Sequence, residues 1–358
     1  MKTLLVATFV DFWAGGSGHR SRISSLLEYL QHRVRITVFF AGRLSDADRN
    51  LLRERFGDVA VESAGMDGPL TYGEYAERFS HFIRDRTFDF ALVEYIELSA
   101  VLEYLPEHTV SLLDTHDLVA DRIRSFKKMG LPYDGIDLTF EEELDIFRCY
   151  DYVVLIQQND LESVARWIDP DRLVLTPHPV PATPGRIRKQ VQNIGFVASP
   201  YLPNVEALGW FLQHVWGPTC EGHALTLNVY GNIRDEFPVP EGCHVRWHGF
   251  VADEEQVYRD SDILINPVRC GAGLKIKNVE ALAHGLPLVT TTHGAAGMED
   301  GAARCFLQAD DAGAFASAIR RLIGDRGLRE TLARNAVAYA RTHFSTEGCY
   351  GAIARLIT

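Results

Sequence analysis

The chain has 358 residues, of which 46% are hydrophobic and 23% are charged, and this is enough for two domains that each bury a core. The formal net charge of −12 argues against a broad surface for nucleic acid, so any anion site must be a local concentration of Lys and Arg. The six cysteines lack metal-binding spacing, and we expect free thiols in a reducing cytosol. No apolar run approaches the roughly 18 residues that a membrane-spanning helix needs.

The first half of the chain begins with an apolar, β-branched run and a glycine-rich loop. Thr3–Val10 is predicted to be a first parallel strand, an interpretation that we favour over a signal peptide. The following loop contains Gly15, Gly16 and Gly18 and leads into a helix for which Ser17 is the candidate N-cap. The spacing of these glycines is not the GxGxxG pattern of a nicotinamide site.

The rest of the first half is predicted to alternate strands and helices, as in a parallel sheet covered by helices. The strands are expected at Val34–Phe40, Phe90–Val93, Thr109–Leu113, Tyr152–Gln157 and Leu173–Thr176, and the helices at Leu44–Phe56, Tyr72–Asp85, Phe140–Cys149 and Asn159–Trp167, the last capped by Asn159 or Asp160. A proline-rich stretch over residues 177–185 is predicted to be a stiff linker. The predicted domains are therefore residues 1–182 and 183–345, followed by a final helix over 346–358.

The second half restarts the same pattern. Strands are expected at Asn193–Ala198, Ala224–Tyr230 and Val245–Phe250, and helices at Val205–Val215, Asp253–Arg259, Asp310–Ile323, Leu328–Thr342 and Glu347–Ile357, with Pro203 and Asn204 capping the first of these helices. No tandem repeat is visible, so the likeness of the two halves is architectural.

Polar side chains follow the strand Thr109–Leu113 directly, over Asp114–Asp117. Groups just beyond the carboxyl end of a parallel strand are well placed for chemistry. His116 is the histidine that we expect to act, and the structural alternative is a hydrogen-bonded histidine at a helix start. Arg122 and Arg124 follow within two helical turns and are expected to face the same region.

The most informative stretch runs from Asp262 to Met298. It contains an apolar strand pattern over Ile263–Pro267, a loop with two glycines, a helix pattern over Leu274–His284, and a second strand pattern over Leu288–Thr292 before another glycine loop. Gly285 stands where a helix C-cap requires a left-handed residue. Such crossovers join parallel neighbours, so both glycine loops leave the carboxyl edge of one sheet, where open α/β sheets bind ligands.

Lys275 and Lys277 stand in the first turn of this helix, where the helix dipole disfavours cations. An anionic ligand at the helix N-terminus would explain both lysines. Lys277 and Glu280 share a helix face, and an ordinary exposed ion pair between them is the structural alternative.

Taken together, these residue types favour one kind of chemistry. Groups that bind a diphosphate also stabilise it as a leaving group, and a carboxylate can accept hydrogen bonds from ribose hydroxyls. No HExxH motif, P-loop or Ser/His/Asp series is visible, and the missing P-loop lysine argues against phosphoryl transfer. The pattern therefore suits the transfer of a sugar from a nucleotide-sugar.

The same stretch resembles the donor-site signature of retaining GT-B glycosyltransferases of family 4, the glycosyl transferases of group 1. The residues that carry the resemblance are Pro267-x-Arg269-x-Gly271-x-Gly273-Leu274-x-x-Lys277-x-x-Glu280-Ala281-Leu282-Ala283-x-Gly285-x-Pro287, with His293-Gly294-x-x-Gly297 similar to the phosphate loop of that family. The resemblance continues over the rest of Phe196–Met298, at Val197…Pro203-Asn204…Trp216, Tyr230-Gly231-Asn232 and His248-Gly249-Phe250-Val251-x-Asp253. The first half matches more loosely, through Gly15-Gly16 and Asp114-x-His116-Asp117.

This resemblance implies an α/β protein of GT-B architecture, in which two Rossmann-like domains turn their parallel sheets toward a central cleft and the final helix packs back on the first domain. It implies catalytic roles for His116, Lys277 and Arg269. Contacts to the nucleotide-sugar donor are expected from Glu280, Lys275, Gly249, Phe250, Val251, Gly273, Leu274, Gly294, Ala295, Ala296 and Gly297, and contacts on the acceptor side from Gly16, Gly18 and Arg122.

The resemblance also implies a mechanism. The anomeric configuration would be retained by front-face attack, and the departing phosphate would take the proton of the acceptor, without a side-chain nucleophile, a metal ion or a cofactor. The expected partners are a nucleotide-sugar and a glycan or lipid-linked acceptor, with no nucleic acid. The expected location is the cytoplasm, with contact at the inner face of the membrane left open.

Two departures from the family pattern leave alternatives open. Ala198-Ser199 stands where many members have Gly-Arg, and Cys270 stands where many have Glu. A catalytically silent subunit that stabilises a partner transferase would tolerate both changes, and it would bind no nucleotide. A nucleotide-sugar epimerase can share the two-domain shape, and it would consume its donor without an acceptor.

Overall fold

The computed structural model describes residues 1–237, 244–251 and 254–358. The chain forms two compact units, each with its own parallel sheet. The first unit comprises residues 1–124, 133–178 and 349–358, and the second comprises residues 125–132 and 179–348. One of the six cysteines, Cys243, and Asp253, the first residue of a predicted helix, lie outside the described residues.

The sheet of the first unit has seven parallel strands in the order β3-β2-β1-β4-β5-β6-β7. The strands are β1 Thr3–Thr8, β2 Arg35–Gly42, β3 Val59–Met66, β4 Phe90–Glu94, β5 Val110–Asp114, β6 Tyr152–Leu155 and β7 Leu173–Leu175. The strand order reverses between β1 and β4. β1 lies between β2 and β4, so its Leu4 pairs with Ile36 of β2 on one side and with Phe90 of β4 on the other. This reversal creates a crevice at the carboxyl edge, directly beside the glycine loop that follows β1.

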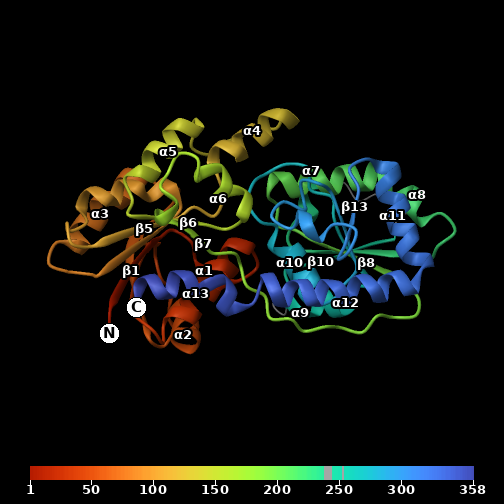
Figure 1. Ribbon diagram of the computed structural model, residues 1–358, viewed down its shortest axis with the longest axis horizontal. Helices are drawn as coiled ribbons and strands as arrows, with labels where there is room; N and C mark the ends of the chain where they lie inside the picture. Colours follow the sequence, from red (N-terminus) through yellow and green to blue (C-terminus); the bar gives the residue numbers. More distant parts are fainter. Residues whose placement is uncertain (238–243, 252–253) are drawn as a thin grey trace. The chain divides into compact units, whose positions relative to one another are not determined.

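Helices cover both faces of this sheet (Figure 1). They are α1 Gly18–Leu30, α2 Asp46–Arg55, α3 Tyr72–Ile83, α4 Val119–Met129, α5 Phe140–Arg148, α6 Gln158–Val164 and α13 Thr346–Ile357, with a 3₁₀ segment, η2, over Ile96–Tyr104. One large apolar core lies between the sheet and the face formed by α3 and α5.

Several helix starts follow the expected capping chemistry, and others do not. Ser45 and Thr139 form complete capping boxes with the residues three positions later. Ser17 occupies the N-cap of α1, yet its hydroxyl makes no capping hydrogen bond. The caps predicted for α6 are wrong, because its N-cap is Gln157 and the helix begins one residue earlier than expected.

The sheet of the second unit has six parallel strands in the order β10-β9-β8-β11-β12-β13. The strands are β8 Asn193–Val197, β9 Thr226–Tyr230, β10 Val245–Gly249, β11 Ile263–Asn266, β12 Leu288–Thr290 and β13 Leu307–Gln308. The order reverses between β8 and β11, and both glycine loops of the informative stretch leave the sheet at this edge.

Helices again lie on both faces (Figure 1). They are α7 Leu202–Phe211, a π-helical turn over Leu212–Trp216, α8 Gly217–Cys220, α9 Glu254–Asp260, α10 Ile276–Ala283, α11 Ala312–Gly324 and α12 Arg326–His343. The N-cap of α7 is Tyr201, so the cap predicted at Asn204 is wrong. The side chain of Asn204 serves the site described below.

Two strands, β3 and β13, were not predicted from the sequence. β3 lies at an edge of its sheet and is mostly half-buried, with Glu62, Ser63 and Gly65 interrupting the apolar pattern. β13 has only two residues. Neither carries the apolar run that marks the central strands, which are buried on both faces.

The helix α13 packs on α1 within the first unit. Tyr350 is fully buried, and its hydroxyl lies 2.6 Å from the hydroxyl of Ser25 and 3.3 Å from the carbonyl oxygen of Arg22. Its ring also lies 5.6 Å from that of Tyr29. Among the described residues, no helix is both long enough and apolar enough to cross a bilayer.

We expect Tyr350→Ala to lower the free energy of unfolding of the first unit by about 3–5 kcal/mol, because it leaves a cavity and removes two buried polar contacts. Urea unfolding of the full-length protein measures the change. Arg355→Ala, on the exposed side of the same helix, is the matched control and should stay within about 0.5 kcal/mol of the wild type. Equal stabilities of the Tyr350 and Arg355 variants would contradict this role for α13.

Candidate functional site

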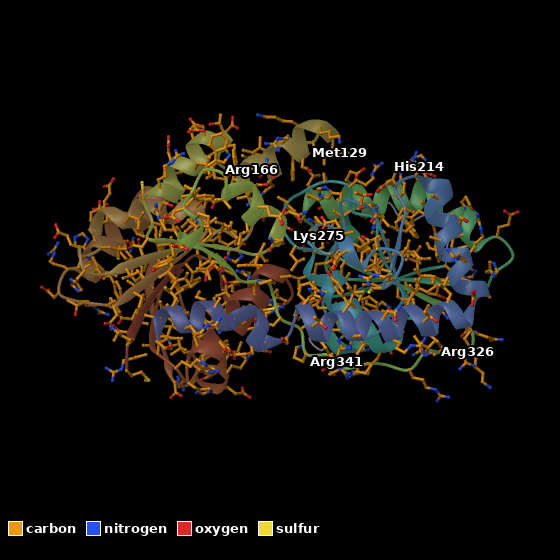
Figure 2. All side chains as sticks on the ribbon, in the orientation of Figure 1. Met129, Arg166, His214, Lys275, Arg326 and Arg341 are labelled. Carbon is orange, nitrogen blue, oxygen red and sulfur yellow. The ribbon has the colours of Figure 1, made fainter. Side chains whose placement is uncertain are left out.

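The loop between β11 and α10 is shaped by two glycines. Gly271 and Gly273 adopt φ angles of 106° and 69°, a left-handed conformation that only glycine adopts without strain. The loop turns directly into α10, whose N-cap is Lys275 (labelled in Figure 2). The first free N–H groups of α10 therefore lie at the carboxyl edge of the sheet, beside the reversal of strand order.

Lys277 is the central cation of this edge. Its Nζ donates to the carbonyl oxygen of Val197 at 2.7 Å and to Oδ1 of Asn204 at 2.9 Å, and it lies 5.2 Å from the centre of the Phe196 ring. Burial, together with the nearby charge of Lys275, lowers the pKa of Lys277 from its usual 10.5 to about 7. In the part of the chain that the structure describes, no carboxylate forms an ion pair with Lys277, so a bound anion would stabilise its charged form.

The neighbouring charged residues have other contacts. Lys275 folds over the glycine loop, where its Nζ donates to the carbonyl oxygens of Ala272 at 3.1 Å and Gly273 at 2.8 Å. Glu280 accepts a hydrogen bond from the hydroxyl of Tyr258. Lys277 therefore does not form the exposed ion pair with Glu280 that was the structural alternative.

Arg269 differs from the lysines because its charge is already balanced. Its guanidinium forms an ion pair with Glu206 of α7 and lies 4.8 Å from the ring centre of Trp210. The hydrogen bonds to Glu206 involve Nε and Nη2 of the guanidinium, and a guanidinium carries five N–H donors in all. The adjacent Cys270 is fully buried, and burial followed by the charge of Glu206 raises its pKa to about 11, so this thiol is inert.

The second glycine loop is fixed to α10 by a buried polar ladder, which the sequence analysis missed. Asn278 donates to the carbonyl oxygen of Gly294 at 2.7 Å and accepts from Asn266 at 2.9 Å. The amide of Gly294 donates to Oγ1 of Thr291 at 2.8 Å. The available signal was Asn278 itself, a polar residue on the otherwise apolar, buried face of α10.

Gly294 is required here by close approach. A Cβ atom at this position would lie 2.2 Å from Oγ1 of Thr290, which itself donates to the carbonyl oxygen of Asn266. Beyond it, Ala295 is buried, Ala296 is half-buried, and Gly297 has a φ of 79°. The loop predicted to hold phosphate is thus backbone with very small side chains, and it is tied to the helix that carries Lys277.

The predicted base-binding residues end β10. The φ of Gly249 is 65°, and its carbonyl oxygen accepts from the amide of Gly231 at 2.7 Å. Phe250 is 53% exposed, which is unusual for a large apolar side chain, and Val251 is half-buried. Leu274, another predicted donor contact, is buried.

Asn204 lies where the sequence departs from the family pattern. Its Nδ2 donates to the carbonyl oxygen of Ser199 at 3.2 Å, while its Oδ1 accepts from Lys277. The side chain therefore joins the Ala198-Ser199 turn to the central lysine. Its role could not be separated from helix capping in the sequence, because Asn is common at both kinds of position.

In the first unit, His116 follows β5 and belongs to a buried charged cluster. Its Nε2 lies 2.6 Å from Oε2 of Glu94, at the end of the neighbouring strand β4. Asp114 accepts two hydrogen bonds from Arg22, at 3.0 and 2.9 Å, and Arg22 also donates to the carbonyl oxygen of Thr176 at 2.6 Å. The sequence analysis assigned no role to Arg22, which lies inside the predicted helix with no distinguishing motif.

The carboxylates of Glu94 and Asp114 and the ring of His116 lie close enough to hold a metal ion, with ligand atoms within 4.8 Å of one another. However, Arg22 is fully buried and donates to both oxygens of Asp114. Its guanidinium supplies the positive charge that a metal ion would bring, so the donor set does not fit a metal.

The predicted acceptor-side residues lie near this cluster in sequence but differ in setting. Gly16 has a φ of 78°, and Gly18 is the first residue of α1. Arg122 forms a half-buried ion pair with Asp117. Next to β4, Oε2 of Glu97 is buried without a hydrogen-bond partner among the described residues, and burial raises the pKa of this carboxyl.

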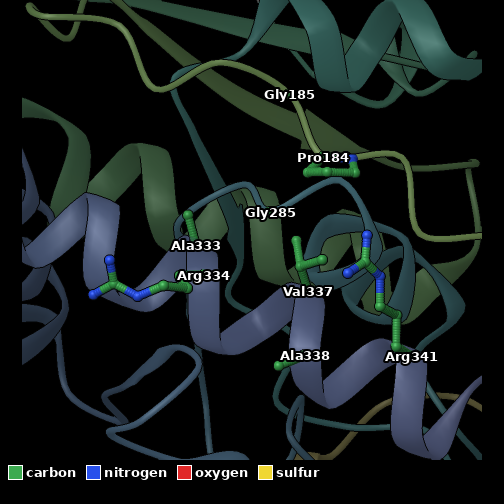
Figure 3. Close-up of a pocket in the computed structure, with 8 residues that line it drawn as sticks. All are labelled: Pro184, Gly185, Gly285, Ala333, Arg334, Val337, Ala338 and Arg341. Atoms are coloured by element: carbon green, nitrogen blue, oxygen red, sulfur yellow. The ribbon is translucent and has the colours of Figure 1, made fainter.

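A pocket of about 410 Å³ lies at the other end of α10, beneath α12 (Figure 3). It is lined by Pro184, Gly185, Gly285, Ala333, Arg334, Val337, Ala338 and Arg341. Because α10 is about 12 Å long, this pocket is separate from the glycine loops and Lys277.

Solved structures share this architecture along nearly their whole length. The structure of Anabaena HepE in complex with UDP and glucose matches 99% of this chain and 99% of its own, with a TM-score of 0.73 and 13% identity. The structure of WaaG, "a glycosyltransferase involved in lipopolysaccharide biosynthesis", matches 99% of each chain, with a TM-score of 0.66 and 15% identity. The protein therefore has the GT-B fold, as the resemblance predicted.

Sequence comparison finds a family model that matches part of the second unit. Residues 191–325, which lie in the second unit and include both glycine loops, match the family described as Glycosyl transferases group 1. A Klebsiella pneumoniae protein described as "Uncharacterized 44.6 kDa protein in cps region" is 22% identical over 346 residues, which cover 91% of this chain and 86% of that protein. These matches support a glycosyltransferase of group 1.

The lowered pKa of Lys277 makes a prediction about stability. Below about pH 7 the folded protein contains a desolvated, charged Lys277, which lowers its stability. Between about pH 7 and 10.5 Lys277 is neutral in the folded state but still charged in the unfolded state, so the free energy of unfolding rises with pH over this range. Between pH 6.5 and 9 the ligand-free wild type should therefore gain roughly 5–10 °C in Tm relative to Lys277→Met. In Lys189→Met, an exposed control, the difference from wild type should not change with pH.

A second prediction concerns the polar ladder. Gly294→Ala should destabilise the second unit by about 1–3 kcal/mol, because the new methyl group must displace Thr290. It should also abolish nucleotide binding, measured by calorimetry. The helical Gly217, which has no neighbouring atom within 4 Å of an added Cβ, is the matched control, and Gly217→Ala should bind as the wild type does. Full nucleotide affinity in Gly294→Ala would contradict a role for this loop.

Proposed function

We propose that this protein transfers a sugar from a nucleotide-sugar donor to a glycan or lipid-linked acceptor, with retention of the anomeric configuration. The observation that carries the proposal is Lys277, a desolvated ammonium without an ion-pair partner among the described residues, held at a helix N-terminus beside two glycine loops. The free N–H groups of that helix end attract the same anion as the ammonium.

The donor's diphosphate would lie between the α10 N-terminus and the loop over residues 294–297. Lys277 and Lys275 would neutralise its charge, and this stabilisation grows as the sugar departs and charge develops on the phosphate. Glu280 would accept hydrogen bonds from the ribose, and Gly249–Val251 would flank the base. Arg269 would join this group.

His116, with Gly16, Gly18 and Arg122 on the acceptor side, would meet the transferred sugar. The acceptor hydroxyl would attack the anomeric carbon while the C–O bond to the phosphate breaks, and its proton would pass to the departing phosphate oxygen. This route needs no side-chain nucleophile. The lysines would perform the task of a metal ion, so we propose that transfer needs none, and that it occurs in the cytoplasm.

The comparisons guide the choice of donor. UDP and glucose occupy the solved HepE structure, so UDP-sugars are the first donors to test. The description "in cps region" of the Klebsiella relative and the involvement of WaaG in lipopolysaccharide biosynthesis favour a polysaccharide or glycolipid acceptor.

The test is a transfer assay with a panel of UDP-, GDP-, dTDP- and ADP-sugars and glycan or lipid-linked acceptors, in EDTA without added metal. Lys277→Ala should reduce the rate by at least about 10²-fold, the usual cost of removing one group that stabilises developing charge. Lys189→Ala should not change it. Proton NMR of the product reports whether the anomeric configuration is retained.

Each contrary outcome points to a defined alternative. Donor turnover without an acceptor would indicate an epimerase. Absence of nucleotide binding by calorimetry, with copurification of another chain, would indicate a silent subunit. An unchanged rate in Lys277→Ala would remove this lysine from the mechanism.

A further inference from the structure

Two strained residues stand side by side at the carboxyl edge of the first sheet. Among the described residues, Tyr95, His116 and Ala303 are the non-glycine residues with positive φ, at 73°, 60° and 60°. Tyr95 directly follows β4, and His116 lies two residues after the end of β5. Their rings stack with centroids 3.9 Å apart and planes 3° from parallel. Each such conformation costs about 1–3 kcal/mol and persists only where the surroundings impose it.

The surroundings that impose this geometry are polar. The amide of Tyr95 donates to the carbonyl oxygen of Asp114 at 3.0 Å, and Glu94 and Asp114 are opposite each other in the parallel register. Glu94 then holds the His116 ring through the 2.6 Å contact to Nε2. The ring is thus fixed on its face by Tyr95 and at one edge by Glu94.

The charges of this cluster do not balance unless the Glu94–His116 pair carries an additional proton. Arg22 and Asp114 form a closed, fully buried ion pair. Glu94 is also fully buried, its Oε1 has no hydrogen-bond partner among the described residues, and burial followed by the charge of Asp114 raises its pKa. An isolated buried carboxylate is very costly, so neutrality requires a proton in addition to the one that a neutral imidazole already holds.

That additional proton has one place where it forms a hydrogen bond, namely between Oε2 of Glu94 and Nε2 of His116. The proton of the neutral imidazole then stands on Nδ1, which makes no hydrogen bond to the described residues. His116 is only 8% exposed, so water has little access to its ring.

We propose that Glu94 is the positioning residue of His116, sharing a proton with Nε2 so that His116 presents Nδ1–H as a hydrogen-bond donor to an oxygen of the substrate. The inference rests on the proposed function for the identity of that substrate, a nucleotide-sugar. Arg22 and Asp114 keep the arrangement neutral without a metal ion.

Two substitutions of Glu94 distinguish a His116 that is protonated at Nδ1 from one whose Nδ1 carries no proton. Glu94→Gln preserves the proton on Nδ1, because the amide N–H of Gln donates to Nε2 as the shared proton does, so kcat should stay within about threefold of the wild type. Glu94→Leu removes the partner, and kcat should fall by about 10²-fold, the usual cost of misplacing one reacting group, while KM for the donor changes less than about threefold.

The matched control lies at the opposite edge of the sheet. Asp151 accepts from the amide and hydroxyl of Ser111, so Asp151→Asn also alters a carboxylate that holds β5, and it should leave kcat unchanged. A 10²-fold loss of kcat in Glu94→Gln, or full activity in Glu94→Leu, would overturn the proposal.

A second measurement does not depend on activity. In full-length protein with ¹⁵N-labelled histidine, the His116 ring, identified by its absence in His116→Asn, should show a protonated Nδ1 in both the wild type and Glu94→Gln. A bare Nδ1 in the wild type would overturn the proposal. If the wild type transfers no sugar from any donor, the proposed function fails, and the NMR result still decides the arrangement of Glu94 and His116.

Discussion

The site in the second unit depends on one unbalanced charge. Lys277 is surrounded by a carbonyl oxygen, an amide oxygen and an aromatic face, all of which attract a cation weakly, and no carboxylate pairs with it among the described residues. The neighbouring carboxylates have other partners: Glu280 accepts a hydrogen bond from Tyr258, and Glu206 forms an ion pair with Arg269. A buried ammonium without an ion-pair partner lowers the stability of the ligand-free protein, and the binding of an anion would restore that stability.

In the first unit the buried charges have partners within the protein. There, two carboxylates and a histidine are buried with Arg22, and the guanidinium matches Asp114 with two hydrogen bonds. The polar groups of this cluster therefore act on one another, and they fix the position of the His116 ring. The carboxyl edge of the second sheet carries a cation without an ion-pair partner among the described residues. The carboxyl edge of the first sheet carries a neutral ring that can form a hydrogen bond.

The parts of this picture that follow from local pattern were predictable. Apolar runs bounded by glycine and proline predicted the central strands. The sequence also predicted that Lys277 and both glycine loops lie at the carboxyl edge of one sheet, where the structure places them, and the binding of an anion there stays a prediction. Tertiary partners were not predictable, because they depend on residues far apart in the chain. Arg269 was expected to act in catalysis, and the sequence did not show that Glu206 of α7 forms an ion pair with it. Arg22 had no predicted role, and the sequence did not show that it pairs with Asp114 at the end of β5. The edge strand β3 was missed because half-buried strands need few apolar residues.

The position of α13 has a consequence for how the chain is made. The first unit draws its last residues, 349–358, from beyond the whole of the second unit, and Tyr350 completes the packing around Ser25 and Arg22. A nascent chain that has emerged as far as residue 178 therefore lacks part of this core. The first unit thus reaches its final packing only after the whole of the second unit has been synthesised, and a polypeptide cut at the linker should expose the part of α1 that Tyr350 covers.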